Sequence, residues 1–154
     1  MCAKTRALGT SQDRLAEKIL FSEVGIPVAP FMPIDSRASL DAAIKAIGTP
    51  AILKTRRLGY DGKGQFRIKS PADVDAAWST LGGQAHTVGL ILEGFVAFER
   101  GWAVVAGSGR PGEFRAGPLG ENVHGDGGLA ASPAPAPGRS GEGRTAHRCR
   151  SARG

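Results

Sequence analysis

Large apolar residues are confined to the first 129 residues of this chain, which limits where a folded core can form. From Ala130 onward the sequence contains no Val, Leu, Ile, Met, Phe, Trp or Tyr and consists mostly of Ala, Pro, Gly, Ser and Arg. Such a segment cannot bury enough apolar area to offset the entropy lost on folding. We therefore predict a short N-terminal remnant at residues 1–10, one modest domain at 11–129 and a disordered tail at 130–154.

The net charge of +6 is concentrated in the same C-terminal segment. Residues 1–129 hold 15 Lys and Arg against 13 Asp and Glu, whereas residues 130–154 hold five Arg and one Glu, so +4 of the charge lies in the last 25 residues. Arginine without interleaved aromatic residues gives only nonspecific attraction to nucleic acid, so we expect no specific nucleic-acid site. A non-enzymatic basic module that binds nucleic acid through the tail stays open as an alternative.

The two cysteines and the hydropathy of the chain bear on its cellular compartment. Cys2 and Cys149 lie near opposite ends, without C-x-x-C spacing or a nearby histidine pair, so we predict neither a metal site nor a redox pair. No run of about 18 consecutive apolar residues occurs, so we expect no membrane segment. A cytoplasmic protein is the expectation.

Apolar periodicity and capping residues predict three helices. The first begins after Asp13 and stops at Gly25, the second is capped by Asp35 or Ser36, and the third begins at Ser70, which is followed by proline. In the first helix the apolar residues at helical spacing are Leu15, Ile19, Leu20 and Val24.

Short strands separate these helices, and this order of elements indicates an α+β fold. Residues 51–54 form a buried-strand candidate, and residues 65–68 alternate polar and apolar side chains, as a half-buried strand does. Residues 88–92 form a further strand. Two later stretches, 102–106 and 113–116, are predicted antiparallel partners.

A glycine-rich loop at residues 58–64 joins two of these strands. Its three glycines can adopt positive φ and let backbone N–H groups turn toward an anion. Lys63 lies inside the loop and Lys54 ends the preceding strand, so both ammonium groups could approach the same phosphates. The run matches neither the GxxxxGK[ST] nor the GxGxxG pattern, so spacing alone leaves open an ordinary hairpin loop with a solvated lysine.

Four segments, taken in order, carry a family resemblance: residues 12–18 (QDRLAEK), 52–65 (ILKTRRLGYDGKGQ), 92–96 (LEGFV) and 121–124 (ENVH). Over about residues 11–129 the chain resembles the ATP-grasp region of the carboxyaminoimidazole ribonucleotide synthase family, the ATPase subunit of phosphoribosylaminoimidazole carboxylase in purine biosynthesis. The arginine-arginine-x-glycine-tyrosine-aspartate-glycine-x-glycine-glutamine element separates this family from most other ATP-grasp enzymes.

The resemblance implies both a fold and a reaction. The fold would be an incomplete ATP-grasp fold, with the nucleotide-gripping lobe and the start of the second lobe. The reaction would use ATP to activate bicarbonate as carboxyphosphate and would carboxylate aminoimidazole ribonucleotide, releasing ADP and phosphate. Mg²⁺ would bridge the phosphates, and family members are commonly homodimeric.

The resemblance also implies an ATP site, residue by residue. Arg14 would contact phosphate or nucleotide, Lys54 would pair with the α- and β-phosphates, and residues 59–65 would cover the triphosphate as a lid. Residues 93–96 would form the hinge that reads the adenine edge, with Glu93 taking the exocyclic amine. The implied ATP-binding residues are Arg14, Lys54, Gly59, Tyr60, Asp61, Gly62, Lys63, Gly64, Gln65, Glu93, Gly94, Phe95, Val96 and His124.

Each of these assignments also has a structural alternative. Arg14 could face solvent and pair with Glu17, Glu93 could be a strand-end carboxylate, and His124 could be a loop histidine without a ligand. The fragment could also belong to another ATP-grasp carboxylate–amine ligase, such as a relative of glycinamide ribonucleotide transformylase or biotin carboxylase.

The chain departs from the family in three respects. The residues before the first helix are too few for the family's substrate-binding domain, and no counterpart is found of the later part of the ATP-grasp domain, which carries the acidic magnesium ligands. Gly101 stands where family members usually have an acidic residue that binds ribose hydroxyls. We therefore expect no catalysis by this chain alone, and we hypothesise that the tail after Leu129 is a frameshifted or otherwise aberrant product.

Overall fold

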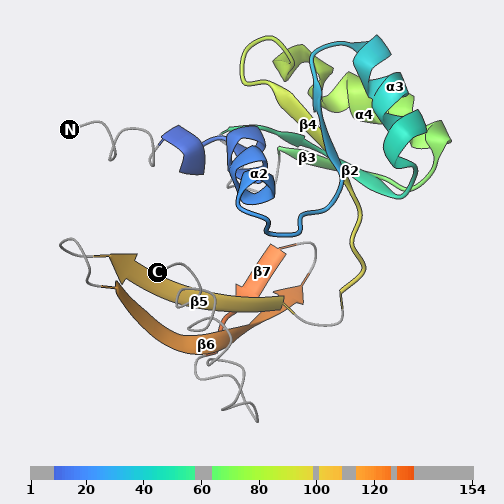
Figure 1. The fold of residues 1–154 in the computed structure, drawn as a ribbon. Helices are drawn as coiled ribbons and strands as arrows, with labels where there is room; N and C mark the ends of the chain where they lie inside the picture. The colour runs from blue at the N-terminus through green and yellow to red at the C-terminus, as the bar shows by residue number, and fades with distance from the viewer. Residues whose placement is uncertain (1–8, 58–63, 99–100, 109–113, 126–127, 134–154) are drawn as a thin grey trace. The chain divides into compact units, whose positions relative to one another are not determined.

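The computed structural model describes residues 9–57, 64–98, 101–108, 114–125 and 128–133. The chain divides into two compact units, Met1–Val96 and Ala97–Gly154, and each has its own antiparallel sheet (Figure 1). Residues 58–63, which hold most of the predicted phosphate loop, and residues 134–154 of the predicted tail lie outside the described residues.

The first unit is built on a four-stranded antiparallel sheet with the strand order β1-β4-β2-β3. The predicted hairpin around the glycine loop is confirmed, since β2 and β3 are antiparallel neighbours. Strand β1 lies at the edge of the sheet, where Pro33 can be accommodated although it has no backbone N–H to donate. The strands are β1 (Phe31–Ile34), β2 (Ala51–Thr55), β3 (Gln65–Ile68) and β4 (Leu90–Gly94).

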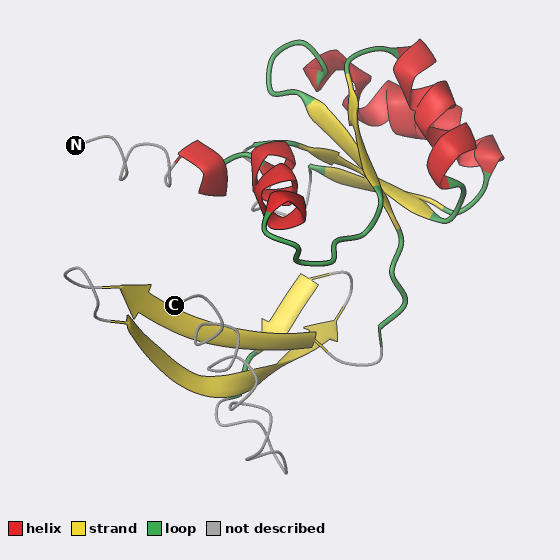
Figure 2. Ribbon diagram, viewed as in Figure 1, coloured by secondary structure: helices red, strands yellow, loops and turns green. Residues whose placement is uncertain are grey.

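Two helices cover one face of this sheet. Helix α3 (Arg37–Ile47) contacts β1 and β4, and helix α4 (Val74–Leu81) contacts β2 and β3. Figure 2 shows α3 and α4 together over the sheet, with α2 (Arg14–Glu23) apart from them. The 3-10 turns η1 (Pro71–Asp73) and η2 (Gly82–Gln84) flank α4. The shared core consists of Ile34, Leu40, Ala43, Ile44, Ala51, Leu53, Ile68, Val74, Ala77, Leu81, Ala85, Leu90 and Leu92.

The sequence signals for the starts of α2 and α3 are confirmed by their caps. Ser36 accepts a hydrogen bond from the Ser39 amide at 3.2 Å, and the Ser39 hydroxyl accepts one from the Ser36 amide at 3.0 Å. This reciprocal arrangement is a capping box with serine in place of the usual glutamate. Asp13 caps α2.

The alternation of side chains along each strand separates the core from the opposite face of the sheet. Leu53 and Leu92 point into the core beneath α3 and α4 and are fully buried. Because successive side chains of a strand point to opposite faces, Lys54 and Glu93, the residues that follow them, project to the other side. That side carries the candidate site.

Helix α2 occurs where it is predicted, but its apolar residues do not enter a core. Ile19, Leu20 and Val24 are 44%, 40% and 37% exposed, and no residue of α2 is buried. Apolar spacing predicted the helix correctly because helix formation follows the local periodicity of the sequence. Burial depends instead on which segments pack against the helix.

The second unit contains a three-stranded antiparallel sheet in the order β5-β6-β7. The predicted pairing of two strands is confirmed, but the second, β6 (Phe114–Gly125), is much longer than residues 113–116. Its Pro118 lies where the register with β5 (Gly101–Ser108) shifts, so that residues 117 and 118 oppose Val105 alone. Such an irregularity accommodates proline inside a strand, which local preference disfavours.

The predicted start of the tail at residue 130 is corrected by strand β7 (Gly128–Ala131), which pairs with β6. The Ser132 hydroxyl donates to Asn122 Oδ1 at 2.6 Å, and the Pro133 carbonyl accepts from the Glu121 amide at 3.1 Å. Small residues that cannot build a core can still satisfy a sheet edge through their backbone groups. Within the described part of the chain, no helix is both long and apolar enough to cross a bilayer.

Candidate functional site

A cavity of about 320 Å³ lies in the first unit, between helix α2, the segment that follows it and the outer face of the sheet. Its α2 residues are spaced at i, i+3, i+4 and i+7, so they form one face of the helix. Lys54 comes from β2 and Glu93 from β4. The lining residues are Arg14, Glu17, Lys18, Phe21, Ile26, Pro27, Val28, Lys54 and Glu93.

Strand register brings Lys54 and Glu93 together across 39 positions of sequence. Lys54 pairs with Ile91 and Ile52 pairs with Glu93, so the lysine and the glutamate are diagonal neighbours on one face of adjacent strands. Lys54 Nζ donates a hydrogen bond to Glu93 Oε2 at 2.9 Å. The two residues therefore form a charge-assisted pair in the cavity wall.

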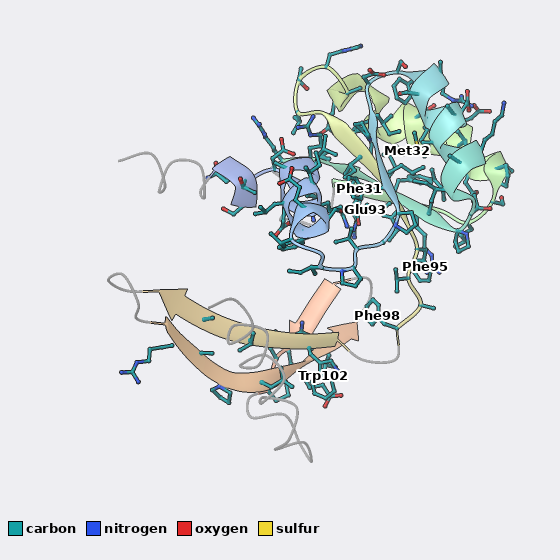
Figure 3. The ribbon with its side chains drawn as sticks, viewed as in Figure 1. Phe31, Met32, Glu93, Phe95, Phe98 and Trp102 are labelled. Atoms are coloured by element: carbon teal, nitrogen blue, oxygen red, sulfur yellow. The ribbon has the colours of Figure 1, made fainter. Side chains whose placement is uncertain are left out.

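A second ammonium group reaches the same carboxylate oxygen. Lys18 Nζ lies 3.5 Å from Glu93 Oε2 and 5.8 Å from the centre of the Phe31 ring. Figure 3 shows Phe31 and Glu93 next to each other beside α2, in agreement with their pairing between β1 and β4. The side chains of Lys18, Lys54 and Glu93 are only 16%, 18% and 10% exposed, so water screens this network weakly.

The charges that line the cavity favour an anionic ligand. Three cationic side chains, Arg14, Lys18 and Lys54, stand against the carboxylates of Glu17 and Glu93. The lining therefore carries a net charge of about +1, which is concentrated where solvent access is limited and field lines are focused. A ligand with negative charge and an apolar portion suits this combination of walls.

Asp13 anchors the start of α2 to the end of β2. Its Oδ1 accepts hydrogen bonds from the amides of Leu15 at 3.0 Å and Ala16 at 3.4 Å. Arg56 donates from Nε to Oδ1 at 3.0 Å and from Nη2 to Oδ2 at 2.6 Å, and Arg57 Nε donates to Oδ2 at 3.2 Å. Asp13 is 2% exposed, so this carboxylate is a buried and fully engaged group.

The environment of Asp13 stabilises its charged form. Burial alone would raise the pKa of Asp13, but the hydrogen bond from Arg56, the positive charge of Arg56 and the two helix amides together outweigh burial. The pKa therefore lies below its ordinary value of 3.8.

Backbone hydrogen bonds complete the link between α2 and the ends of the glycine loop. The Arg14 amide donates to the Arg56 carbonyl at 3.0 Å, and the Arg56 amide donates to the Gly89 carbonyl at 2.9 Å. The Thr55 amide donates to the Gly64 carbonyl at 2.8 Å. Arg14 is thus held at a defined position beside the cavity.

The structure brings three of the predicted site residues, Arg14, Lys54 and Glu93, to one cavity. Gln65 begins β3 directly opposite Lys54. Gly59, Tyr60, Asp61, Gly62 and Lys63 lie outside the described residues. His124 pairs with Leu129 between β6 and β7 in the second unit, and its side chain is outside the described part.

The predicted hinge residues also serve the fold. The Gly94 amide donates to the Pro30 carbonyl at 2.8 Å, and the Phe95 amide donates to the Pro50 carbonyl at 3.1 Å. The guanidinium carbon of Arg67 lies 4.1 Å from the centre of the Phe95 ring. Val96 follows with 53% of its surface exposed.

Several lining residues were not predicted to belong to the site. Lys18 follows Arg14 by four positions, and this helical spacing was the signal that could have identified it. Asp13 could have been identified from its place before a helix, but its arginine partners are 43 and 44 positions away. Across the described ranges, no group of three or more His, Cys, Asp or Glu lies together in a way that could hold a metal ion.

The ATP-grasp domain is the family model that matches this chain, over residues 19–151. Because the match spans most of the sequence, the chain belongs to the ATP-grasp family. Within it, the chain is similar to N5-carboxyaminoimidazole ribonucleotide synthases. The Pseudomonas aeruginosa synthase is 48% identical over 126 residues, which cover 82% of this chain and 34% of the relative. That of Brucella melitensis is 46% identical over 132 residues, or 84% of this chain and 35% of the relative.

Solved structures agree with these relatives. The N5-carboxyaminoimidazole ribonucleotide synthetase from Thermus thermophilus has a TM-score of 0.77 at 42% identity, over 94% of this chain and 37% of that chain. A synthetase of the same name, solved as an ADP complex, has a TM-score of 0.81 at 34% identity, over 93% of this chain and 37% of that chain. The predicted resemblance and α+β ATP-grasp fold are confirmed, and the chain spans about a third of the length of the curated relatives it matches.

Proposed function

We propose that this chain is the ATP-binding part of an enzyme that carboxylates aminoimidazole ribonucleotide with ATP and bicarbonate, giving N5-carboxyaminoimidazole ribonucleotide, ADP and phosphate. The names of the relatives support the reaction. An ADP complex at 34% identity and an ATP complex from Aspergillus clavatus at 27% identity support the nucleotide. The observation that carries the proposal is the convergence of Arg14, Lys54 and Glu93 on one cavity.

In this proposal the phosphates bind at the cationic end of the cavity. Lys54 supplies a compact charge at the end of a buried strand, and Arg14 supplies a planar group suited to phosphate oxygens. Residues 59–65 cover the phosphates from the loop between β2 and β3. The bond from the Thr55 amide to the Gly64 carbonyl holds one end of that loop beside Lys54.

The base lies at the end of β4, where Glu93 accepts a hydrogen bond from the exocyclic amine of adenine. Four apolar lining residues provide a wall suited to the face of a base: Phe21, Ile26, Pro27 and Val28. Since the amides of Gly94 and Phe95 donate to carbonyls of the fold, the hinge amide that we assign to the adenine edge is that of Val96. His124 is assigned to the nucleotide site by resemblance alone.

Mg²⁺ is proposed as a companion of ATP, bound through the phosphates. The described cavity does not fit a magnesium ion held by the protein. Its lining has only two carboxylates, Glu17 and Glu93, and Glu93 is already paired with two ammonium groups, whereas Mg²⁺ requires several oxygen ligands in octahedral geometry. We assign no step to the ion. Bicarbonate, aminoimidazole ribonucleotide and a homodimeric assembly are proposed for the whole enzyme, which this chain matches over about a third of its length.

Calorimetric titration of Mg-ATP into the full chain and into a Lys54→Ala variant tests the nucleotide assignment. We expect the variant to bind about 10- to 100-fold more weakly, the loss that follows removal of a charged hydrogen-bond donor. Lys69→Ala, which removes an exposed lysine outside the cavity, is the matched control and should bind as the unmodified chain does. Equal binding by the chain and by Lys54→Ala, or binding by neither, would contradict the proposal.

A further inference from the structure

Lys54 has two roles that it cannot perform at once. In the structure its ammonium group donates to Glu93 at 2.9 Å. The proposed function requires the same group to move onto phosphate. The Glu93 side chain is 10% exposed, and a carboxylate with so little water around it is costly to leave without a cationic partner.

Lys18 is placed to remove this conflict. Its Nζ is 3.5 Å from the same Glu93 oxygen that Lys54 contacts, so the carboxylate already has a second cation. The Phe31 ring, 5.8 Å away, provides a further favourable surface for the ammonium group. Asp13 and Arg56 anchor the start of the helix that carries Lys18, which fixes its distance from the sheet.

We propose that Lys18 is a positioning residue: it keeps Glu93 paired and in place while Lys54 transfers from Glu93 to the phosphates of the nucleotide. This inference rests on the proposed ATP-binding function. Lys18 then acts through Glu93 and does not touch the phosphates. Its contribution is needed only when Lys54 leaves, and only while position 93 carries a negative charge.

A double-mutant cycle on the full chain tests this assignment, with Mg-ATP as the titrant in calorimetry. Four proteins are compared: the unmodified chain, Lys18→Met, Glu93→Gln and the double variant. Lys18→Met should weaken ATP binding by at least about tenfold, because a partly desolvated charge loses its remaining partner. In the Glu93→Gln background the same change should alter binding by less than about twofold, because an uncharged side chain needs no counter-ion.

Adenosine separates positioning from a general structural effect. It has no phosphates, so Lys54 stays on Glu93 when it binds, and Lys18→Met should change its affinity far less than that of ATP. Lys18→Arg keeps the positive charge and should restore most of the ATP affinity. Met is chosen because its thioether packs favourably against aromatic rings such as that of Phe31, and equal midpoints of thermal unfolding would show that the Lys18→Met protein is folded.

Two outcomes would overturn the inference while leaving the proposed function intact. If Lys18→Met weakens ATP binding equally with and without the charge at position 93, then Lys18 acts independently of Glu93. If the unmodified chain binds ATP, Lys54→Ala weakens binding and Lys18→Met does not, Glu93 needs no second cation. Absence of ATP binding by the unmodified chain would overturn the function and the inference together.

Discussion

The carboxylate of Asp13 fixes the start of helix α2, and this helix forms one wall of the cavity. It accepts hydrogen bonds from the first turn of α2 and from two arginines at the end of β2. Arg56 contacts both of its oxygens, a geometry that is both stronger and more directional than a single contact. The position of Arg14 in the cavity therefore depends on a neighbour that does not line it.

The charge of Asp13 should be visible in the pH dependence of stability. Because the folded-state pKa is lowered below the ordinary 3.8, ionised Asp13 stabilises the fold at pH values above the unfolded-state pKa, and this contribution is lost as the pH falls through the lowered value. Asp13→Asn can still cap a helix but lacks the charge. We expect it to reduce the free energy of unfolding by about 1–3 kcal/mol at pH 7.

Urea unfolding at a series of pH values from 7 to below 4 measures this effect. The unmodified chain should lose more stability than Asp13→Asn as the pH falls below about 4, so that the two curves converge. Parallel curves over that range would show that Asp13 does not supply the pH-dependent part of the free energy of unfolding.

Among the elements, α4 shows how close packing restricts the side chain that can follow a helix. Gly82 follows the last residue of α4 and lies under the ring of Trp78, one turn earlier. A Cβ atom at Gly82 would be 2.6 Å from that ring, closer than van der Waals contact permits. Trp78 packs in turn against the core, so its ring cannot move away without disturbing other side chains.

Two neighbouring glycines provide a matched test of this packing. Gly82→Ala should lower the free energy of unfolding by about 1–3 kcal/mol, because the added methyl group forces the Trp78 ring out of position. Gly83→Ala should be close to neutral, because no heavy atom lies within 4 Å of a Cβ at that position. Chemical denaturation followed by tryptophan fluorescence measures both, and equal stabilities would contradict the packing argument.

On the scale of the whole molecule, the buried apolar cluster found among the described residues belongs to one of the two units. Every residue of the core cluster lies between Ile34 and Leu92, within Met1–Val96. In the second unit β5, β6 and β7 pair through their backbones, and Val105 in β5 is 84% exposed. The two sheets share no strand, so each has its own hydrogen-bond network.

This division predicts that a core mutation acts on one unit only. Leu40 in α3 is fully buried, and Leu40→Ala should destabilise the first unit by about 2–5 kcal/mol through lost burial and a residual cavity. Hydrogen exchange monitored by mass spectrometry should become faster in β1 to β4 and stay unchanged in β5 and β6. Equal acceleration in both sheets would show that the units unfold as one.

The sequence by itself determined the local elements and the family. Caps and stop residues such as Ser36 and Gly48 mark helix ends through hydrogen bonds within a few residues, and the strand–glycine loop–strand pattern is equally local. Ordered motifs identified the ATP-grasp resemblance and singled out Arg14, Lys54 and Glu93, which line one cavity. The length of β6 was underestimated, because proline and glycine disfavour a strand that the irregular register accommodates.

Only the tertiary structure decided which side chains meet. Lys54 and Glu93 are 39 positions apart, and Asp13 and Arg56 are 43 positions apart. Lys18 reaches Glu93 only because α2 lies against the outer face of the sheet, although its apolar residues Ile19 and Leu20 remain exposed. No tight turn joins β2 to β4, so their register depends on hydrogen bonds and burial between distant segments, as does the docking of α2.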